Sequence, residues 1–540
     1  MSIMELRVYL SKLFLPAFIN RAILSFTANP DDRPKPQPPR PTAYLDGLRG
    51  VAALIVYIFH WSYLWFPQLR YGYGVDNNKL FWQLPVIRAL HSGRSSVTVF
   101  FVISGFVLSI KTLKLIHQRK DDQVLSALSG SSFRRPFRLY LPIIVSTFMV
   151  AFVVYAGWYK DDPSGAPIPP KGNTLDQQLR HWFWSTIDII NPFRLIDNRR
   201  NMSGSVYNGH LWTIPVEFKG SLLVYILILI FARAKRWIHA VGVTGVAFWL
   251  IFSGDWDQAL FAIGLLLAEL SIIRPPNAFT TATPDNAIPV FDIQIPKKSS
   301  ARSTKILQHA MTLVLFFLAL HFISYPEVDG ASTPGYITLS QKVPAYYLND
   351  SDRNQQYWNS VGSVMLIIAL MCSPGVSLTP IVSWTHRKLD FLRRQINLDL
   401  EVQKEPLLSE SFAENGAAAL EPLLQRPFTT TFAQFLGQIS YSFYLWHGTI
   451  IHTVGAMWMN PASVAWDQAA KEIAALVVAG NDPAADKLRR KACTAYYLAF
   501  LLGTLVNTLA LLWVSDVFNR LVDAPAVRFT RWISKKAWTK

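Results

Sequence analysis

The chain has 540 residues, of which 51% are hydrophobic, 13% aromatic and only 16% charged, with a net charge of +17. A soluble globular protein carries about 25% charged residues, so the composition argues against a series of soluble domains. Lysine and arginine lie mainly in short segments between apolar runs, which favours a membrane protein over a nucleic-acid-binding protein. The two cysteines, Cys372 and Cys493, offer neither a disulfide framework nor a metal motif. We therefore expect no bound metal and no nucleic-acid partner.

The first 43 residues are expected to form a cytoplasmic segment. Met1–Phe26 has basic residues interrupting its apolar ones, which is typical of a helix at the membrane interface rather than of a cleavable signal. Residues 27–43 are rich in proline and should be extended.

Ten apolar runs follow, each close to the roughly 20 residues that cross a hydrocarbon core. They lie near 44–66, 96–116, 139–158, 213–232, 236–252, 256–273, 306–324, 360–382, 432–453 and 495–518. The fold class is thus all-α, a polytopic bundle of about ten transmembrane helices. We expect residues 44–520 to form this domain and residues 521–540 a basic cytoplasmic tail.

Charged residues between the runs predict the topology. The segments 111–138, 233–236, 274–305 and 384–404 are rich in lysine and arginine, whereas 253–257 has neither. Cytoplasmic loops carry such an excess, so both termini are predicted to be cytoplasmic. One segment disagrees, because Lys487, Arg489, Arg490 and Lys491 would lie outside. The stretches 161–170 and 395–428 have the composition of loops.

The first predicted span contains Asp46, Arg49 and His60 on one stripe. Eleven residues separate Arg49 from His60, which returns a helix to within about 20° of the same direction and advances it about 16 Å. Charged groups in a membrane cost several kcal/mol and often mark functional sites. The stripe suits a single ligand or a partner helix equally well, so the spacing alone gives no reaction.

Polar residues also mark four later segments. Ser104 and Gly105 in the second run would let another helix approach closely. Arg135 and Arg138 precede the third run, either as a flanking basic segment or as a phosphate-binding pair. Glu217 opens the fourth run, where it would stabilise a helix N-terminus or serve a site. In the ninth run Ser440, Tyr444 and His447 belong to a polar and aromatic stretch that would line a cavity or lie at the interface.

Together these segments resemble the acyltransferase 3 family of membrane enzymes. The resemblance rests on five motifs in the family's order: Leu45-Asp46-Gly47-Leu48-Arg49-Gly50 with His60, Phe100-Phe101-Val102-Ile103-Ser104-Gly105-Phe106, Arg135-Pro136-Phe137-Arg138, Trp212-Thr213-Ile214-Pro215-Val216-Glu217, and Ile439-Ser440-Tyr441-Ser442-Phe443-Tyr444-Leu445-Trp446-His447. It covers roughly residues 40 to 520 and is closest in character to fungal members. Thr98-Val99 stand where the family often has an acidic residue.

The resemblance implies an enzyme that moves an acyl group, often acetyl, from acyl-CoA to a hydroxyl of a glycan, lipid or secondary metabolite. It implies that His60, Arg49 and Glu217 are catalytic and that Arg135 and Arg138 bind the acyl-CoA co-substrate. Asp46, Ser104, Ser440, Tyr444 and His447 would line the site. No permanently bound cofactor is expected.

Two routes remain open for His60, as a general base toward the acceptor hydroxyl or as a nucleophile that forms an acyl-histidine. In the first route Arg49 would stabilise the oxyanion. The rival function is a multi-pass transporter or flippase, although no internal repeat supports it. The sequence leaves open the acceptor, the acyl length and the membrane, whether plasma membrane or endomembrane.

Overall fold

A computed structural model describes residues 40–75, 78–163, 168–191, 205–273, 301–348, 350–375 and 422–537. These residues form helices joined by turns, with only isolated β-bridges among them, which confirms the predicted all-α fold. The predicted interfacial helix at Met1–Phe26 and the basic segments 274–300 and 384–404 lie outside the described residues.

Seven helical segments of the described chain are long and apolar enough to cross a membrane. They are Ala43–Trp65 (α3), Gly93–His117 (α4), Asp121–Tyr155 (α5), Gly209–Phe231 (η7 with α7, Thr213–Phe231), Trp256–Ile273 (α9), Ile306–Ile323 within α10 (Ala301–Ile323), and Asp482–Ala537 (α18, Asp482–Phe518, with α19, Ala524–Ala537). The chain is thus an integral membrane protein.

Judged by the length and composition of its helices, the described part of the chain has fewer than the ten predicted spans. Helix α8 (Arg236–Phe252) is apolar but shorter. Helices α12 (Ser351–Cys372) and α16 (Thr431–Ile450) correspond to the eighth and ninth predicted runs, but polar side chains lower their hydropathy. In α16 these side chains face the interior, where Ser440, Ser442 and His447 are buried.

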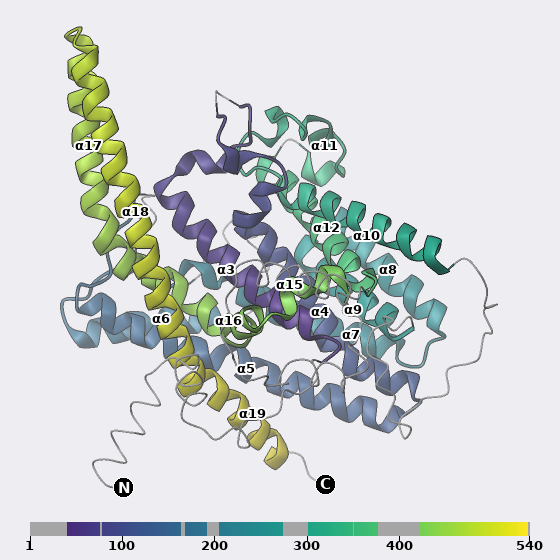
Figure 1. The fold of residues 1–540 in the computed structure, drawn as a ribbon. Helices are drawn as coiled ribbons and strands as arrows, with labels where there is room; N and C mark the ends of the chain where they lie inside the picture. The colour runs from purple at the N-terminus through teal and green to yellow at the C-terminus, as the bar shows by residue number, and fades with distance from the viewer. Residues whose placement is uncertain are drawn as a thin grey trace, which may run out of the picture.

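Three helical segments lie outside the predicted spans, one of them in a segment expected to be a loop. Helix α5 begins at Asp121, so it runs for 35 residues through the predicted 111–138 loop. Helix α6 (Leu175–Ile190) was not predicted, and its N-cap Thr174 accepts a hydrogen bond from the amide of Gln177. Residues 456–478 form α17, which pairs with α18 in a hairpin that projects beyond the rest of the molecule (Figure 1). The remaining α-helices, α11 (Ile337–Gln341) and α15 (Arg426–Thr429), are short.

Helices α3 and α16 pack together near the centre of the bundle (Figure 1). A Cβ atom on Gly50 would lie 2.3 Å from the amide nitrogen of Gly437, and one on Gly437 would lie 2.3 Å from the carbonyl oxygen of Asp46. Real side chains do not approach so closely, so glycine is required on both helices. This backbone contact fixes the first predicted span against the ninth.

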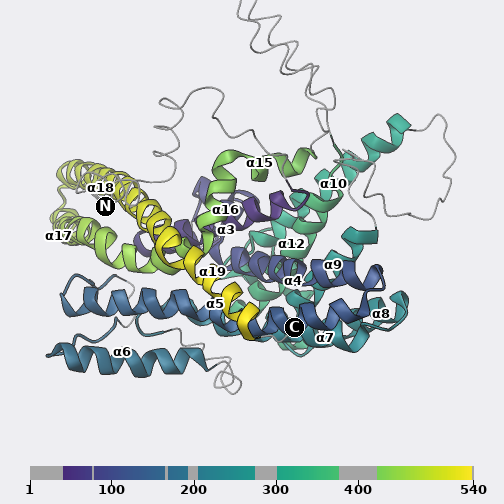
Figure 2. The same ribbon diagram turned by 90° about the horizontal axis from the view of Figure 1, so that it is seen from below.

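Helix α19 lies across α5, as Figure 2 shows from below. Arg134 on α5 donates a hydrogen bond to Ser534 Oγ on α19 at 3.1 Å. A π-helical turn, Asn519–Asp523, separates α19 from α18. Such turns often occur at functional sites, and this one precedes the helix that packs against α5.

Candidate active site

Arg49 on α3 is held by α16. Its Nε donates to Ser440 Oγ at 2.9 Å, and its Nη2 donates to the carbonyl oxygen of Gly437 at 2.8 Å. Asp46 lies one turn earlier, where it pairs with Arg40 at 3.1 Å and approaches Arg49 only to 3.9 Å. The α3–α16 contact therefore orients the guanidinium of Arg49, and Asp46 contributes little to that.

A cavity of about 500 Å³ opens beside Arg49. Polar residues from seven helical segments meet in its lining: Arg49 (α3), Ser104 (α4), Arg135 and Arg138 (α5), Thr213 and Glu217 (α7), Gln438, Ser440, Tyr441 and Tyr444 (α16), Asn519 and Asp523 (the π-helical turn), and Arg528 and Arg531 (α19). Five arginines but only two carboxylates line the cavity, so its walls carry an excess of three positive charges. Such a wall favours a polyanionic ligand.

One ion pair is built into the cavity wall. Arg135 Nη2 donates to Glu217 Oε1 at 2.6 Å, and Arg135 Nε donates to Ser221 Oγ at 2.8 Å. Ser104 Oγ lies 3.4 Å from the same Glu217 oxygen. Because Arg135 is buried, these partners offset the cost of removing its charge from water.

Three further arginines of the wall have no such partner. Within the described part of the chain, Arg138, Arg528 and Arg531 form no ion pair with a carboxylate. Their guanidinium groups can therefore bind phosphate in the bidentate geometry that arginine favours.

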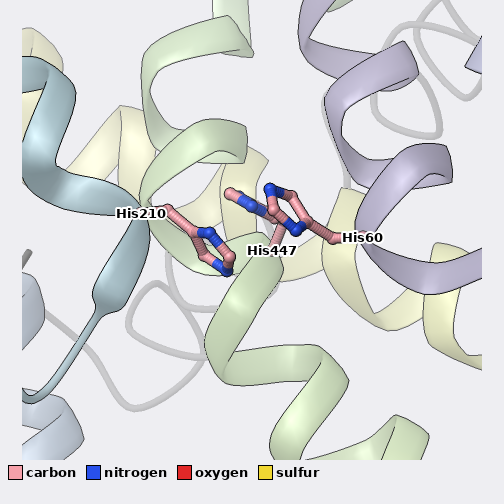
Figure 3. A group of neighbouring side chains, drawn as sticks. All are labelled: His60, His210 and His447. Atoms are coloured by element: carbon pink, nitrogen blue, oxygen red, sulfur yellow. The ribbon is translucent and has the colours of Figure 1, made fainter. Parts of the chain in front are cut away.

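Three histidines from distant parts of the sequence meet at a second location (Figure 3). His60 lies on α3, His210 on the 3₁₀ turn Gly209–Trp212, and His447 on α16. Their ring centroids are 4.0 Å apart for His60 and His210, 4.4 Å for His210 and His447, and 5.3 Å for His60 and His447. One nitrogen from each ring lies within 4.8 Å of the others, so the three could share a metal ion or a proton.

The hydrogen bonds of His447 define its tautomer. Its Nδ1 lies 2.6 Å from the carbonyl oxygen of Tyr444. A carbonyl oxygen only accepts, so Nδ1 carries the proton and, in the neutral ring, Nε2 carries a lone pair. His447 is 1% exposed, and its Nε2 has no hydrogen-bond partner among the described residues.

His210 depends on its neighbours for its position. The side chain of Asn208 accepts a hydrogen bond from the His210 amide at 3.1 Å and donates one to the carbonyl oxygen of Leu445 at 2.8 Å. A Cβ atom on Gly448 would lie 2.7 Å from His210 Cδ2. Asn208 and Gly448 thus bring the loop before α7 against α16.

Tyr444 joins the cavity to the three histidines. Its ring lines the cavity, and its hydroxyl donates to the carbonyl oxygen of His210. The hydroxyl also lies 2.8 Å from Thr213 Oγ1. A ligand in the cavity that touches Tyr444 is therefore one residue from the histidines.

The structure divides the residues singled out in the sequence into two groups. Seven of them line the cavity: Arg49, Ser104, Arg135, Arg138, Glu217, Ser440 and Tyr444. Two belong to the histidine cluster, His60 and His447. Asp46 lies in neither. Sequence reasoning missed His210, Asp523, Arg528 and Arg531. His210 stands beside the Trp212–Glu217 motif, which was a usable signal, whereas no sequence signal places residues 523–531 at the cavity.

The chain is similar in sequence to known acyltransferases. Residues 42–282 match the family described as an acyltransferase domain. The chain is 26% identical over 510 residues to the O-acetyltransferase PaAT-1 of Phomopsis amygdali, covering 91% of this chain and 84% of that protein. It is 25% identical to an acyltransferase of a Phoma species and 23% identical to the acyltransferase clz18 of Cochliobolus lunatus, each match covering 63% of this chain and 78% of the relative. No solved structure matches the chain.

Proposed function

We propose that this chain, whose residues 42–282 match the acyltransferase domain family, is an O-acyltransferase that moves an acetyl group from acetyl-CoA to a hydroxyl acceptor. The observation that carries the proposal is that Tyr444 joins the arginine-lined cavity to the cluster of three histidines. The acetyltransferase activity named for the relative from Phomopsis amygdali supports the choice of acetyl. The acceptor classes we propose are lipids, glycans and secondary metabolites.

The arginine-lined cavity suits the phosphate groups of the donor. Arg138, Arg528 and Arg531 offer guanidinium groups without carboxylate partners, and Arg49 adds a fourth positive charge. Hydrogen bonds between arginine and phosphate are charge-assisted and stronger than neutral ones. Arg135 is already paired with Glu217, so its role is to shape the wall and keep the arginines apart.

His60 is the proposed base. Its neutral imidazole takes the proton of the acceptor hydroxyl as the oxygen attacks the thioester carbonyl, and coenzyme A leaves as the thiol after it receives that proton. An acyl-histidine route starts from the same unprotonated nitrogen and forms a bond between it and the acyl carbon first. Both routes require the His60 lone pair, and the neighbouring histidines supply no positive charge when neutral.

We assign Arg49 to binding of the donor rather than to stabilisation of the oxyanion. Eleven residues of α3 separate Arg49 from His60, about 16 Å along the helix. Two side chains so far apart do not reach the same carbonyl oxygen. The hydrogen bonds of Arg49 to Ser440 and Gly437 also place it two turns of α16 away from His447.

The test is acyl transfer by the purified full-length protein with radiolabelled acetyl-CoA and acceptor-containing extracts. We expect His60→Ala to lose about 10²–10⁴-fold in rate, the contribution typical of a histidine general base. The matched control is His309→Ala on α10, because His309 lies outside both the cavity and the cluster. Full activity of His60→Ala would refute the role of His60. A transporter or flippase would leave acetyl-CoA unconsumed with every acceptor.

A further inference from the structure

The histidine cluster contains more imidazole rings than acid–base catalysis alone requires. A single base needs one imidazole, yet three rings from three elements place a nitrogen within 4.8 Å of one another. No carboxylate of the described residues pairs with any of the three, so the cluster is not arranged to hold imidazolium ions. Neutral imidazoles that converge in this way present lone pairs to a common point.

His447 shows that at least one lone pair has no protein partner. Its Nδ1–H is donated to the Tyr444 carbonyl oxygen, and its buried Nε2 accepts nothing from the described residues. Metal-bound histidines commonly have this arrangement, in which one ring nitrogen binds the metal and the other donates to a backbone carbonyl. The hydrogen bond fixes both the ring orientation and the nitrogen that is available.

We propose that His60, His210 and His447 form a binding site for a divalent transition-metal ion of the zinc class. Imidazole nitrogen suits zinc, copper, nickel and cobalt. Zinc–nitrogen bonds of about 2.0–2.1 Å in a tetrahedron put the ligand nitrogens about 3.3 Å apart. The three nitrogens must therefore close from at most 4.8 Å, a change within reach of side-chain rotation. Three histidines leave the fourth position open.

Binding of the ion removes the His60 lone pair from acid–base chemistry. The ion forms a coordinate bond with the same electron pair that accepts the acceptor's proton, so the metal-bound enzyme cannot use His60 as base or nucleophile. The site is thus inhibitory. This inhibition rests on the proposed function, whereas the binding itself does not.

The binding experiment uses full-length protein in detergent, purified with a tag that contains no histidine, stripped with a chelator and then dialysed. Zinc is added and the metal retained per chain is measured by mass spectrometry, and cobalt is added in parallel to record the absorption of a tetrahedral ion. We expect about one ion per chain in the wild type and a loss in His210→Ala and His447→Gln. The control His321→Ala removes a histidine of α10 that stacks on Tyr336 outside the cluster, and should retain the ion.

Thermal unfolding of each variant separates lost binding from lost folding, and His210→Gln serves if His210→Ala does not fold. Absence of stoichiometric zinc from the wild type, or unchanged zinc in the folded His210 and His447 variants, would overturn the site. Such a result would leave the acyl-transfer assay and the role of His60 intact.

The second measurement is the rate of acetyl transfer with and without zinc. We expect zinc to inhibit acetyl transfer at the concentration that fills the site, and a chelator to restore it. Loss of activity on chelation, with activity regained on adding zinc, would overturn the inhibitory role and the assignment of His60 as base together.

Discussion

The arginine-lined cavity and the histidine cluster differ in how their polar groups are satisfied. In the cavity wall Arg49 and Arg135 each make two hydrogen bonds to protein partners, and the excess charge is left on the arginines of α5 and α19. In the cluster no ring carries a carboxylate partner, and His447 keeps an unused lone pair. This difference supports the proposals that the first region holds a charged ligand and that the second exchanges a proton or binds an ion.

The two regions are tied at Tyr444 and along the α3–α16 contact. Both helices contribute to each region, with Arg49 and Ser440 at one level and His60 and His447 at the other. Changes in the cavity should therefore alter donor binding and leave the histidines in place. Substitution of Tyr444, the junction between the two regions, should alter kcat.

The largest effect is expected from breaking the ion pair in the cavity wall. Glu217→Gln leaves the buried Arg135 guanidinium without its counter-charge, and the loss of one partner of a buried pair costs about 3 kcal/mol of stability. Thermal unfolding in detergent measures this loss. The double variant R135Q/E217Q removes both charges and should regain most of the stability. Equal stability of the single and double variants would show that the unpaired charge is not the cause.

The next effect concerns the arginines of α19. The double variant R528Q/R531Q removes two positive charges from the cavity wall, and we expect a rise of roughly tenfold in the KM for acetyl-CoA, about 1.4 kcal/mol, with kcat little changed. The control K535Q/K536Q removes the same charge from the same helix outside the cavity. The effect should also shrink at high salt. Equal KM values for the two double variants would exclude a local role for Arg528 and Arg531.

The smallest effect tests the junction. Tyr444→Phe removes the hydroxyl that donates to the His210 carbonyl oxygen, and a neutral hydrogen bond contributes about 1 kcal/mol. We expect kcat to fall roughly fivefold while the KM for acetyl-CoA stays within a factor of two. Tyr441→Phe is the comparison, because Tyr441 also lines the cavity but donates to Leu139 on α5. A change confined to KM would place Tyr444 with the cavity alone.

The fold class was predictable because apolar runs of spanning length have few alternative structures. The sequence also predicted that Arg49 and His60 share a face of α3, and the structure places both against α16. Helical periodicity is enough for such a prediction within one segment. It gives no partner helix, and the pairing of α3 with α16 depends on glycines almost 390 residues apart, Gly50 and Gly437.

The segments missed as helices are the amphipathic ones. Residues 121–138 and 456–478 mix polar and apolar residues, so a search for apolar runs predicts loops there. The roles of residues 519–531 depend on a π-helical turn, whose extra residue is not encoded by any simple periodicity. Residues 521–540 were predicted to be a basic tail, and composition does not indicate that Arg528 and Arg531 line a cavity.

The distribution of the cavity wall along the chain has a consequence for biosynthesis. Arg49, Arg135 and Glu217 are made early, while Ser440 and the residues of α19 follow more than 200 residues later. Chains emerge from the ribosome in order, and early segments fold first. A nascent chain therefore holds its first arginines and its first histidine well before their partners exist. The cavity that we propose for the donor is complete only when the late helices have inserted.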